Sequence, residues 1–344
     1  MTKVAIVILN YNGKHFLQQF LPSVLNHSAG AKVIVADNGS TDHSADFVRE
    51  TYPQVEVITL PENKGFCGGY NAVLKLVNAT YYVLLNSDVE VTAHWLDPVI
   101  ELMDSNSNIA AAQPKILSQR SKNKFEYAGA GGGQIDMLAY PFCRGRMFET
   151  LEEDHGQYND TVPVFWASGA CLFVRADCFH AMDGLDEDFF AHMEEIDLCW
   201  KLARSNFAIY YCGKSTVYHV GGGTLSASNP RKTYFNFRNG LSLLVKHQRV
   251  SSLIWKFPFR LILDWVAALH FLTIGSGAHA RAIIIAHLSF LRRFRAEISK
   301  RKVVARKVKS FEVPGIYAGL VVFDYFLFGK RICPPQKQEA SAKD

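Results

Sequence analysis

Short apolar runs recur through the first part of the chain, with room for a helix between them. They are residues 4–9 (VAIVIL), 32–36 (KVIVA) and 81–85 (YYVLL). The interval between the first two runs carries apolar residues at helical spacing, namely Phe16, Phe20, Leu21, Val24 and Leu25. Strands that alternate with helices are typical of a parallel sheet, so the pattern predicts an α/β fold.

Each predicted strand ends in polar residues. The clusters are residues 10–13 (NYNG), 37–42 (DNGSTD) and 86–88 (NSD). Taken singly, each cluster could be a turn, because Asn, Asp, Gly and Ser are common turn residues. In open parallel sheets, however, ligands bind beyond the carboxyl ends of the strands. The three clusters together therefore predict one binding crevice at that edge of the sheet.

A glycine-rich stretch, residues 63–71 (NKGFCGGYN), lies between the second and third clusters. Glycines allow a backbone to approach a ligand closely. The stretch matches neither the G-x-G-x-x-G fingerprint of dinucleotide-binding folds nor the P-loop pattern. A nucleotide ligand therefore stays possible, without either of those phosphate-binding loops.

The charge is distributed unevenly along the 344 residues, whose formal net charge is +5. Residues 246–309 hold 14 Lys or Arg against Asp264 and Glu297, a net of +12. The same segment places Ile284, Leu288, Leu291 and Ile298 on one face of a predicted helix. A basic amphipathic helix indicates an anionic membrane surface. The alternatives are a helix packed on its own domain with a solvated basic back, and a nucleic-acid partner.

No segment has the length and polarity expected of a membrane-spanning helix, which needs about 20 mostly apolar residues. Residues 265–280 contain two histidines and a Gly-Ser-Gly turn, and residues 313–329 contain Pro314 and Asp324. Peripheral or re-entrant attachment fits both segments better. The run at residues 4–9 lacks a basic leader and a cleavage site, and the seven cysteines include no C-x-x-C pair, so reduced cytosol is the expected compartment.

A series of motifs across residues 4–224 resembles the family 2 nucleotide-sugar glycosyltransferases. The segments are VAIVILNYNG, VIVADNGSTD, NKGFCGGYNA, LLNSDVEV, WASGACLFVR, GLDEDFFAHMEEIDLCWKL and VYHVGGGT, in that family's order. The resemblance implies the single-domain GT-A fold and, within the family, is strongest to bacterial rhamnosyltransferase-like members that extend lipid-linked or surface polysaccharides. The last 120 residues carry no motif of this kind.

The resemblance also implies roles for individual residues. Asp37 would read the nucleotide base, and the other implied donor-binding residues are Asn10, Asn38, Gly65, Asn71, Asn86 and Asp88. The family's D-x-D motif stands here as Asn86-Ser87-Asp88, so Asn86 could bind ribose while Asp88 holds a divalent cation. His219 matches the position that supplies a second ligand. Carboxylate and imidazole ligands suit Mn²⁺ or Mg²⁺.

An acidic cluster lies within residues 186–202 (DEDFFAHMEEIDLCWKL). In the family a Glu-Asp pair occupies the place of Glu194 and Glu195, and its second member is the catalytic base of inverting enzymes. Glu195 is therefore the implied base, one methylene longer than usual, and Glu194 and Trp166 are the implied acceptor-binding residues. Asp197 and Lys201 are spaced i, i+4, as in a solvated ion pair on a helix surface.

The sequence thus predicts a GT-A domain over residues 1–225, with a mostly parallel nucleotide-binding sheet flanked by helices. A basic, membrane-associating helical extension over 226–333 and a disordered tail over 334–344 are expected to follow. The predicted function is inverting transfer of a sugar from dTDP-rhamnose or a UDP-sugar to a hydroxyl of a glycan or lipid-linked saccharide in cell-surface polysaccharide synthesis. The protein is expected in the cytoplasm, peripheral on the inner face of the plasma membrane, without a nucleic-acid partner. The alternatives are a noncatalytic nucleotide-sugar-binding protein of the same fold and a nucleotidyltransferase.

Overall fold

The computed structural model describes residues 2–221 and 229–334 around a central 9-stranded sheet. The sheet has the order β11-β13-β6-β12-β4-β1-β2-β3, with β5 paired to β13. Its strands are β1 (Thr2–Asn10), β2 (Lys32–Asp37), β3 (Glu56–Thr59), β4 (Ala79–Asn86), β5 (Val89–Val91), β6 (Ile109–Ser118), β11 (Thr161–Val164), β12 (Cys171–Arg175) and β13 (Ala208–His219). Strands β1, β2, β3 and β4 pair in parallel, whereas β12 runs antiparallel to both β4 and β6. The predicted α/β class is confirmed, and the three predicted apolar runs lie within β1, β2 and β4.

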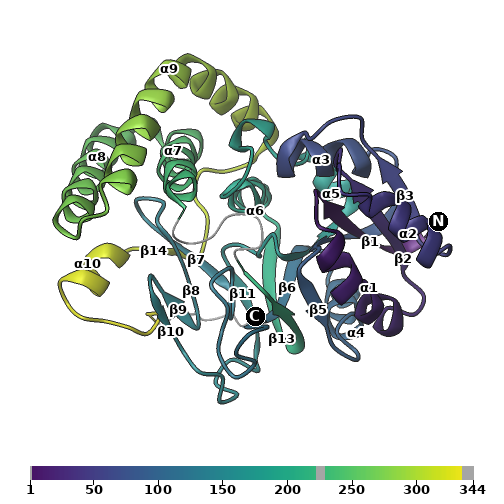
Figure 1. Ribbon diagram of the computed structural model, residues 1–344. Coiled ribbons are helices and arrows are strands. Elements are labelled where there is room, and N and C mark those ends of the chain that lie inside the picture. The colour runs from purple at the N-terminus through teal and green to yellow at the C-terminus, as the bar shows by residue number, and fades with distance from the viewer. Residues whose placement is uncertain (1, 222–228, 335–344) are drawn as a thin grey trace.

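Both faces of the sheet are buried, which explains why its strands are nearly continuous in apolar residues. Along β1, Val4, Ile6 and Ile8 belong to one core, while Ala5 and Val7 belong to the other. The first core is covered by α1 (Lys14–His27), α2 (Ser44–Thr51) and α4 (Asp97–Ser105). The second is covered by α3 (Gly65–Leu74), α5 (Ala176–Ala181) and α6 (Glu194–Arg204), with the short 3₁₀ helix η1 (Glu187–Phe189) before α6. Figure 1 shows these helices on the two sides of the strands.

The C-terminal part of the chain packs against the rest through helices and one strand. The helices are α7 (Pro230–His247), α8 (Val250–Thr273), α9 (Gly277–Lys307) and α10 (Val321–Phe326). Leu243 and Leu244 of α7 are buried in the same core as α3 and α6. A second sheet, of β7 (Gly133–Asp136), β8 (Pro141–Cys143), β9 (Arg146–Met147) and β10 (Thr150–Leu151), is completed by β14 (Ile316–Tyr317), which pairs in parallel with β7. The helical extension is therefore docked onto the catalytic half of the molecule (Figure 1).

One predicted boundary and most of the predicted tail fall where the chain is not described. The boundary at residue 225 lies within residues 222–228, which are not described. The predicted tail begins at residue 334, and its residues from 335 onward lie outside the described part of the chain. Within residues 2–221 and 229–334, no helix has both the length and the apolar character needed to cross a bilayer.

Candidate active site

The carboxyl ends of β1 and β2 bring Asn10 and Asp37 together, as the strand pattern predicted. The two residues are direct partners in the parallel ladder, and both are buried. Asn10 Nδ2 donates to Ser44 Oγ at 2.8 Å, and the Ser40 amide donates to Asp37 Oδ2 at 3.3 Å. Asn10 Oδ1 is buried and accepts no hydrogen bond from the described part of the chain. This end of the crevice therefore offers a buried carboxylate beside a free amide oxygen.

Asn38, Gly65 and Asn71 hold chain segments in place. Asn38 Nδ2 donates to the Gly65 carbonyl at 2.9 Å, which fixes the start of α3. Gly65 has φ +70, and a Cβ there would come within 2.8 Å of the Phe190 ring. Asn71 Nδ2 donates to the Leu185 carbonyl at 2.7 Å and Asn71 Oδ1 accepts from the Leu185 amide at 2.9 Å. The polar groups or close approaches of these three residues serve the chain itself, and the donor contacts predicted for them stay predictions.

Asp88 and His219 meet because β5 pairs with the end of β13, with His219 opposite Val89. His219 Nε2 lies 3.1 Å from Asp88 Oδ1, and Asn86 Nδ2 lies 3.4 Å from the same ring nitrogen. On the other side of the ring, His219 Nδ1 lies 3.1 Å from Glu126 Oε2. Asp88, Glu126 and His219 are all buried. The predicted proximity of Asp88 and His219 is therefore present in the structure.

Glu126 was not found from the sequence, because it belongs to none of the motifs and reaches His219 only through the fold. Its carboxylate packs against Gly221, where a Cβ would come within 2.3 Å of Glu126 Oε1. Burial disfavours the charged imidazolium, but Asp88 and then Glu126 outweigh that effect and raise the pKa of His219 to about 10. The ring is thus held as a cation between two carboxylates, and a metal ion bound here would take the place of that proton.

Asp88, Glu126 and His219 offer only a small set of ligands for a divalent cation. Within the described ranges, no group of three or more His, Cys, Asp or Glu side chains is arranged to hold a metal ion. One carboxylate oxygen of Asp88 and one imidazole nitrogen of His219 are nevertheless ligands that Mn²⁺ accepts. These residues fit a cation that takes its other ligands from a bound diphosphate and from water.

Glu194 and Glu195 open α6 after a turn in an unusual backbone conformation. Phe190, His192 and Met193 all have positive φ, at 65°, 67° and 74°. Such angles are costly for residues other than glycine, so surrounding contacts must hold them. Asn239 of α7 supplies several, because its Nδ2 lies within hydrogen-bond distance of the carbonyls of Phe189 (3.2 Å), Ala191 (3.0 Å) and His192 (2.7 Å).

The two glutamates differ in their protonation. Burial raises the pKa of Glu195 to about 7. Burial together with the neighbouring charge of Glu195 raises the pKa of Glu194 well above its usual range. Within the described chain, neither Oε2 atom has a hydrogen-bond partner. The environment therefore favours the protonated form of Glu194, whereas Glu195 is poised between its two forms near neutral pH.

Asp197 departs from the solvated ion pair that its spacing predicted. Its carboxylate lies 3.4 Å from Lys201 Nζ, but both side chains are buried, at 1% and 7% exposure. The carboxylate also lies 2.9 Å from Lys246 Nζ and 2.9 Å from His247 Nε2. Burial opposes ionisation of Asp197, but Lys246 and Lys201 outweigh it and hold its pKa well below the usual range. The pair is part of a buried charge network that joins α6 to α7.

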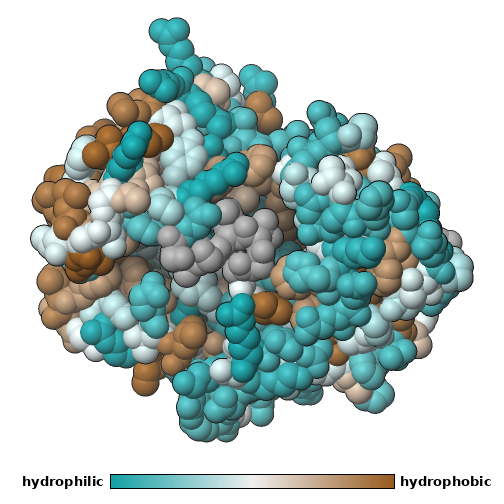
Figure 2. All heavy atoms as spheres, viewed as in Figure 1, coloured by the Kyte–Doolittle hydropathy of each residue, from teal (hydrophilic) through white to brown (hydrophobic). Residues whose placement is uncertain are grey.

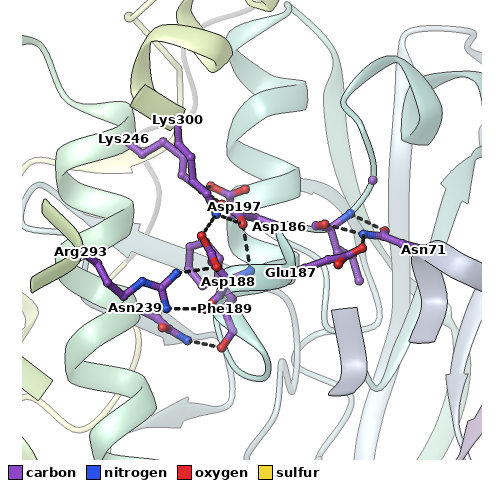
Figure 3. Close-up of polar contacts among 12 residues, drawn as sticks. Asn71, Asp186, Glu187, Asp188, Phe189, Asp197, Asn239, Lys246, Arg293 and Lys300 are labelled. Carbon is purple, nitrogen blue, oxygen red and sulfur yellow. Dashed lines mark hydrogen bonds and ion pairs between the residues drawn. The ribbon is translucent and has the colours of Figure 1, made fainter. Parts of the chain in front are cut away.

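Figure 3 shows part of this network, with Lys246, Arg293 and Lys300 directed toward Asp186, Asp188 and Asp197. Lys246 reaches Asp186 at 2.6 Å as well as Asp197, and Lys300 of α9 pairs with both Asp186 and Asp188. Arg293 of α9 pairs with Asp188 at 2.7 Å. Several cations of the basic segment therefore form ion pairs with acidic residues of the N-terminal part of the chain.

Trp166 is a core residue, although the sequence predicted an acceptor contact for it. The side chain is 4% exposed, and its indole N–H donates to the Gln134 carbonyl at 2.8 Å. A Cβ on Gly133 would come within 2.1 Å of the Trp166 ring, so the ring lies flat against that glycine. Its polar atom and its face are therefore both occupied by the chain.

Residues 5–167 match the family model described as "Glycosyl transferase family 2". The chain therefore contains a glycosyltransferase family 2 domain. Among curated relatives, the N-acetylglucosaminyl-diphospho-decaprenol L-rhamnosyltransferase of Mycobacterium tuberculosis is 25% identical over 233 residues, which cover 62% of this chain and 75% of the relative. Rhamnosyltransferase WbbL of Escherichia coli K12 is 22% identical over 216 residues, covering 60% of this chain and 80% of that protein.

Solved structures support the same fold for this glycosyltransferase. The structure of GalNAc-T7 with UDP, GalNAc and Mn²⁺ superposes with a TM-score of 0.54 at 12% identity, covering 73% of this chain and 49% of that one. The predicted GT-A fold and the resemblance to rhamnosyltransferases are confirmed. The roles of the individual site residues stay predictions.

Proposed function

We propose that this glycosyltransferase is an inverting enzyme in which Glu195 is the catalytic base. The observation that carries the proposal is the state of the two glutamates at the start of α6. Glu195 has a pKa of about 7 and an oxygen without a partner in the described chain, whereas Glu194 is held protonated. A general base works best when its pKa lies near the operating pH.

The proposed reaction is a single displacement at the anomeric carbon of the donor sugar. Glu195 accepts the proton of an acceptor hydroxyl, and that oxygen forms a bond to the anomeric carbon. The bond between the anomeric carbon and the donor phosphate oxygen breaks, and the nucleoside diphosphate leaves with the electron pair. Attack from the side opposite the leaving group inverts the configuration. Protonated Glu194 is suited to donate a hydrogen bond that orients the acceptor.

The donor would lie along the carboxyl ends of the strands. Asp37 and Asn10 are proposed to bind the base, and Asn86 a ribose hydroxyl. Asp88 and His219 would hold Mn²⁺ or Mg²⁺, which when bound would offset the negative charge of the departing diphosphate. The short distance between Asp88 and His219 supports this assignment.

The donor and acceptor classes are proposed from the relatives. The name of the Mycobacterium relative describes rhamnosyl transfer to a diphospho-decaprenol carrier. For this chain we propose dTDP-rhamnose or a UDP-sugar as donor and a hydroxyl of a glycan or lipid-linked saccharide as acceptor, in cell-surface polysaccharide synthesis. The enzyme would then work in the cytoplasm, at the inner face of the plasma membrane.

A transfer assay with dTDP-rhamnose and UDP-sugars tests the proposal, with each donor supplied with and without Mn²⁺. Glu195→Gln is expected to lower kcat by about 10²- to 10⁴-fold while donor binding, followed by calorimetry, is retained. Glu194→Gln is the matched control and is expected mainly to raise the acceptor KM. Full turnover by Glu195→Gln together with loss of turnover by Glu194→Gln would exchange the two roles. Donor binding without turnover of any donor by the native chain would favour a noncatalytic nucleotide-sugar-binding protein.

A further inference from the structure

Helix α8 exposes apolar residues, buries Arg260 and Asp264, and leaves Lys256 half-buried. The exposed side chains are Ile254, Trp255, Ile262, Trp265, Val266, Leu269 and Leu272, each between 47% and 76% exposed. Over the whole of α8, all of which is described, no exposed residue is Asp, Glu, Lys or Arg. A helix on the surface of a protein in water normally carries its charges on the outer face. The outer face of α8 is therefore suited to an apolar medium.

The charges of α8 are turned inward. Arg260 Nε lies 2.8 Å from Asp264 Oδ1, with the two side chains 2% and 0% exposed. Tyr140 donates to Asp264 Oδ1 at 2.8 Å, and His287 of α9 lies 3.1 Å from Asp264 Oδ2. Charges removed from water must be paired in this way. The arrangement buries an ion pair beneath α8 while leaving leucine, isoleucine and tryptophan outside.

The apolar surface of α8 continues onto its neighbours. Phe259 of α8 contacts Phe323 of α10, with ring centroids 6.2 Å apart. The chain then exposes Phe326, Leu327 and Phe328, at 59%, 67% and 69%. On α9 the exposed apolar residues are Ile284, Ile285, Leu288 and Leu291. We call the exposed apolar residues of α8 and α9, together with Phe326, Leu327 and Phe328, the apolar face. Figure 2 shows apolar residues gathered along the left side of the molecule, where Figure 1 places α8 and α10.

Helix α9 adds a row of unpaired cations beside the apolar face. Its inward cations include Arg293, Lys300 and Lys307, which pair with aspartates of the catalytic half. Arg301 is also buried and donates to the Val245 and Gln248 carbonyls. The remaining five cations, Arg281, Arg292, Arg295, Lys302 and Arg306, are exposed and have no ion-pair partner among residues 2–221 and 229–334. At 3.6 residues per turn these five fall within an arc of about 80°, and Leu288 falls inside the same arc. We call them the basic stripe.

We propose that the apolar face and the basic stripe dock together on an anionic lipid bilayer. Helix α8 would lie in the plane of the interface, with Trp255 and Trp265 at the level of the headgroups, where tryptophan is enriched. The basic stripe would meet the lipid phosphates. A second copy of this chain is a poorer occupant, because it would bring a like-charged stripe to the same surface. The link to a lipid-linked acceptor rests on the proposed function, whereas the docking rests on α8, α9 and α10.

Vesicle flotation with the full chain tests the docking. The probes are vesicles of phosphatidylcholine alone and vesicles in which about 30 mol% of the lipid is the anionic phosphatidylglycerol. Binding is expected to the anionic vesicles and to fall at high salt. Arg292→Gln with Arg295→Gln is expected to weaken binding at least about tenfold, since each cation near such a surface contributes about fivefold. Trp265→Ser with Leu269→Ser is expected to weaken binding to both vesicle types.

The matched control replaces an exposed lysine and leucine elsewhere. Lys75→Gln with Leu76→Ser alters one cation and a 70% exposed leucine just after α3 and is expected to leave vesicle binding unchanged. Equal binding of the native chain to neutral and anionic vesicles, or equal weakening by this control, would overturn the proposal. So would a concentration-dependent dimer, measured by light scattering, that Trp265→Ser with Leu269→Ser abolishes. If transfer to a soluble acceptor fails while vesicle binding follows the expected pattern, the proposed function fails and the docking stands.

Discussion

Lys246 Nζ lies 2.9 Å from Asp197 Oδ1, and each of the two side chains is 1% exposed. The contact joins α7 of the helical extension to α6, the helix that begins with Glu194 and Glu195. A buried charge of this kind is tolerated only because its partner is present. The extension is therefore part of the support of the candidate active site as well as a surface of its own.

The first prediction concerns this ion pair. Lys246→Met leaves Asp186 and Asp197 without their shared cation and should lower the free energy of unfolding by about 3–5 kcal/mol, measured by urea denaturation. The control is Arg249→Met, which removes the partner of Glu312 in a pair that is 55% and 80% exposed. That change should cost at most about 1 kcal/mol. Equal losses in the two variants would contradict a special role for the buried pair.

Asn239 provides a second prediction, because it holds the turn before α6. Asn239→Ala removes the amide that lies near the carbonyls of Phe189, Ala191 and His192. We expect kcat to fall at least about tenfold while the donor KM changes little, because the base loses its position rather than its chemistry. The pH at half-maximal kcat should also shift, which a loss of folded protein alone would not produce. Asn239→Asp should be no more active than Asn239→Ala, because a carboxylate cannot donate to these carbonyls.

The pH dependence of transfer follows from the pKa of Glu195. Because a base must be deprotonated, kcat should rise with pH through a midpoint at about 7 and then level off. The effect on stability has the opposite sign. The folded pKa is raised, so the folded state binds more protons than the unfolded chain between about pH 4.5 and 7 and loses stability as the pH rises through that window.

The raised pKa of Glu195 also makes Glu195→Gln a stabilising variant at high pH. Glutamine cannot ionise, so the variant should be more stable than the native chain at pH 8, by roughly 2 kcal/mol, and should approach it at pH 5. Thermal unfolding at the two pH values measures this difference. The opposite result is a native chain that gains stability relative to the variant between pH 5 and pH 8. That result would show that burial does not disfavour the charged form of Glu195.

The proposed cation site leads to a prediction that does not depend on turnover. Asp88→Asn and His219→Gln should each weaken binding of dTDP or UDP in the presence of Mn²⁺ while leaving the weaker, metal-free binding unchanged. Glu126→Gln should have a smaller effect, because Glu126 contacts only the far side of the His219 ring. Calorimetric titrations with and without EDTA measure these differences. Unaltered Mn²⁺ dependence in His219→Gln would remove His219 from the ligand set.

The sequence by itself determined the α/β class and the edge of the sheet at which the polar clusters gather. The apolar runs became β1, β2 and β4, and Asn10, Asp37 and Asn86 stand at their carboxyl ends. These features depend on residues close together in the chain, whose spacing sets the type of element and the end at which polar residues emerge. The helical face of Ile284, Leu288, Leu291 and Ile298 was predicted in the same way. The first three are exposed, whereas Ile298 is half-buried and packs against the core formed by Leu241, Val245 and Phe290.

Only the tertiary structure decided which polar side chains are engaged by distant parts of the chain. Asn71 and Trp166 are engaged by Leu185 and Gln134, and Glu126 reaches His219 across 93 positions of sequence. Likewise, the net charge of the basic segment concealed the cations that are paired inward with Asp186, Asp188 and Asp197. Whether a buried polar group is stable depends on a partner from a distant segment that compensates for lost water. Local spacing carries no information about that partner, so only the packing of α7 and α9 against α6 could reveal it.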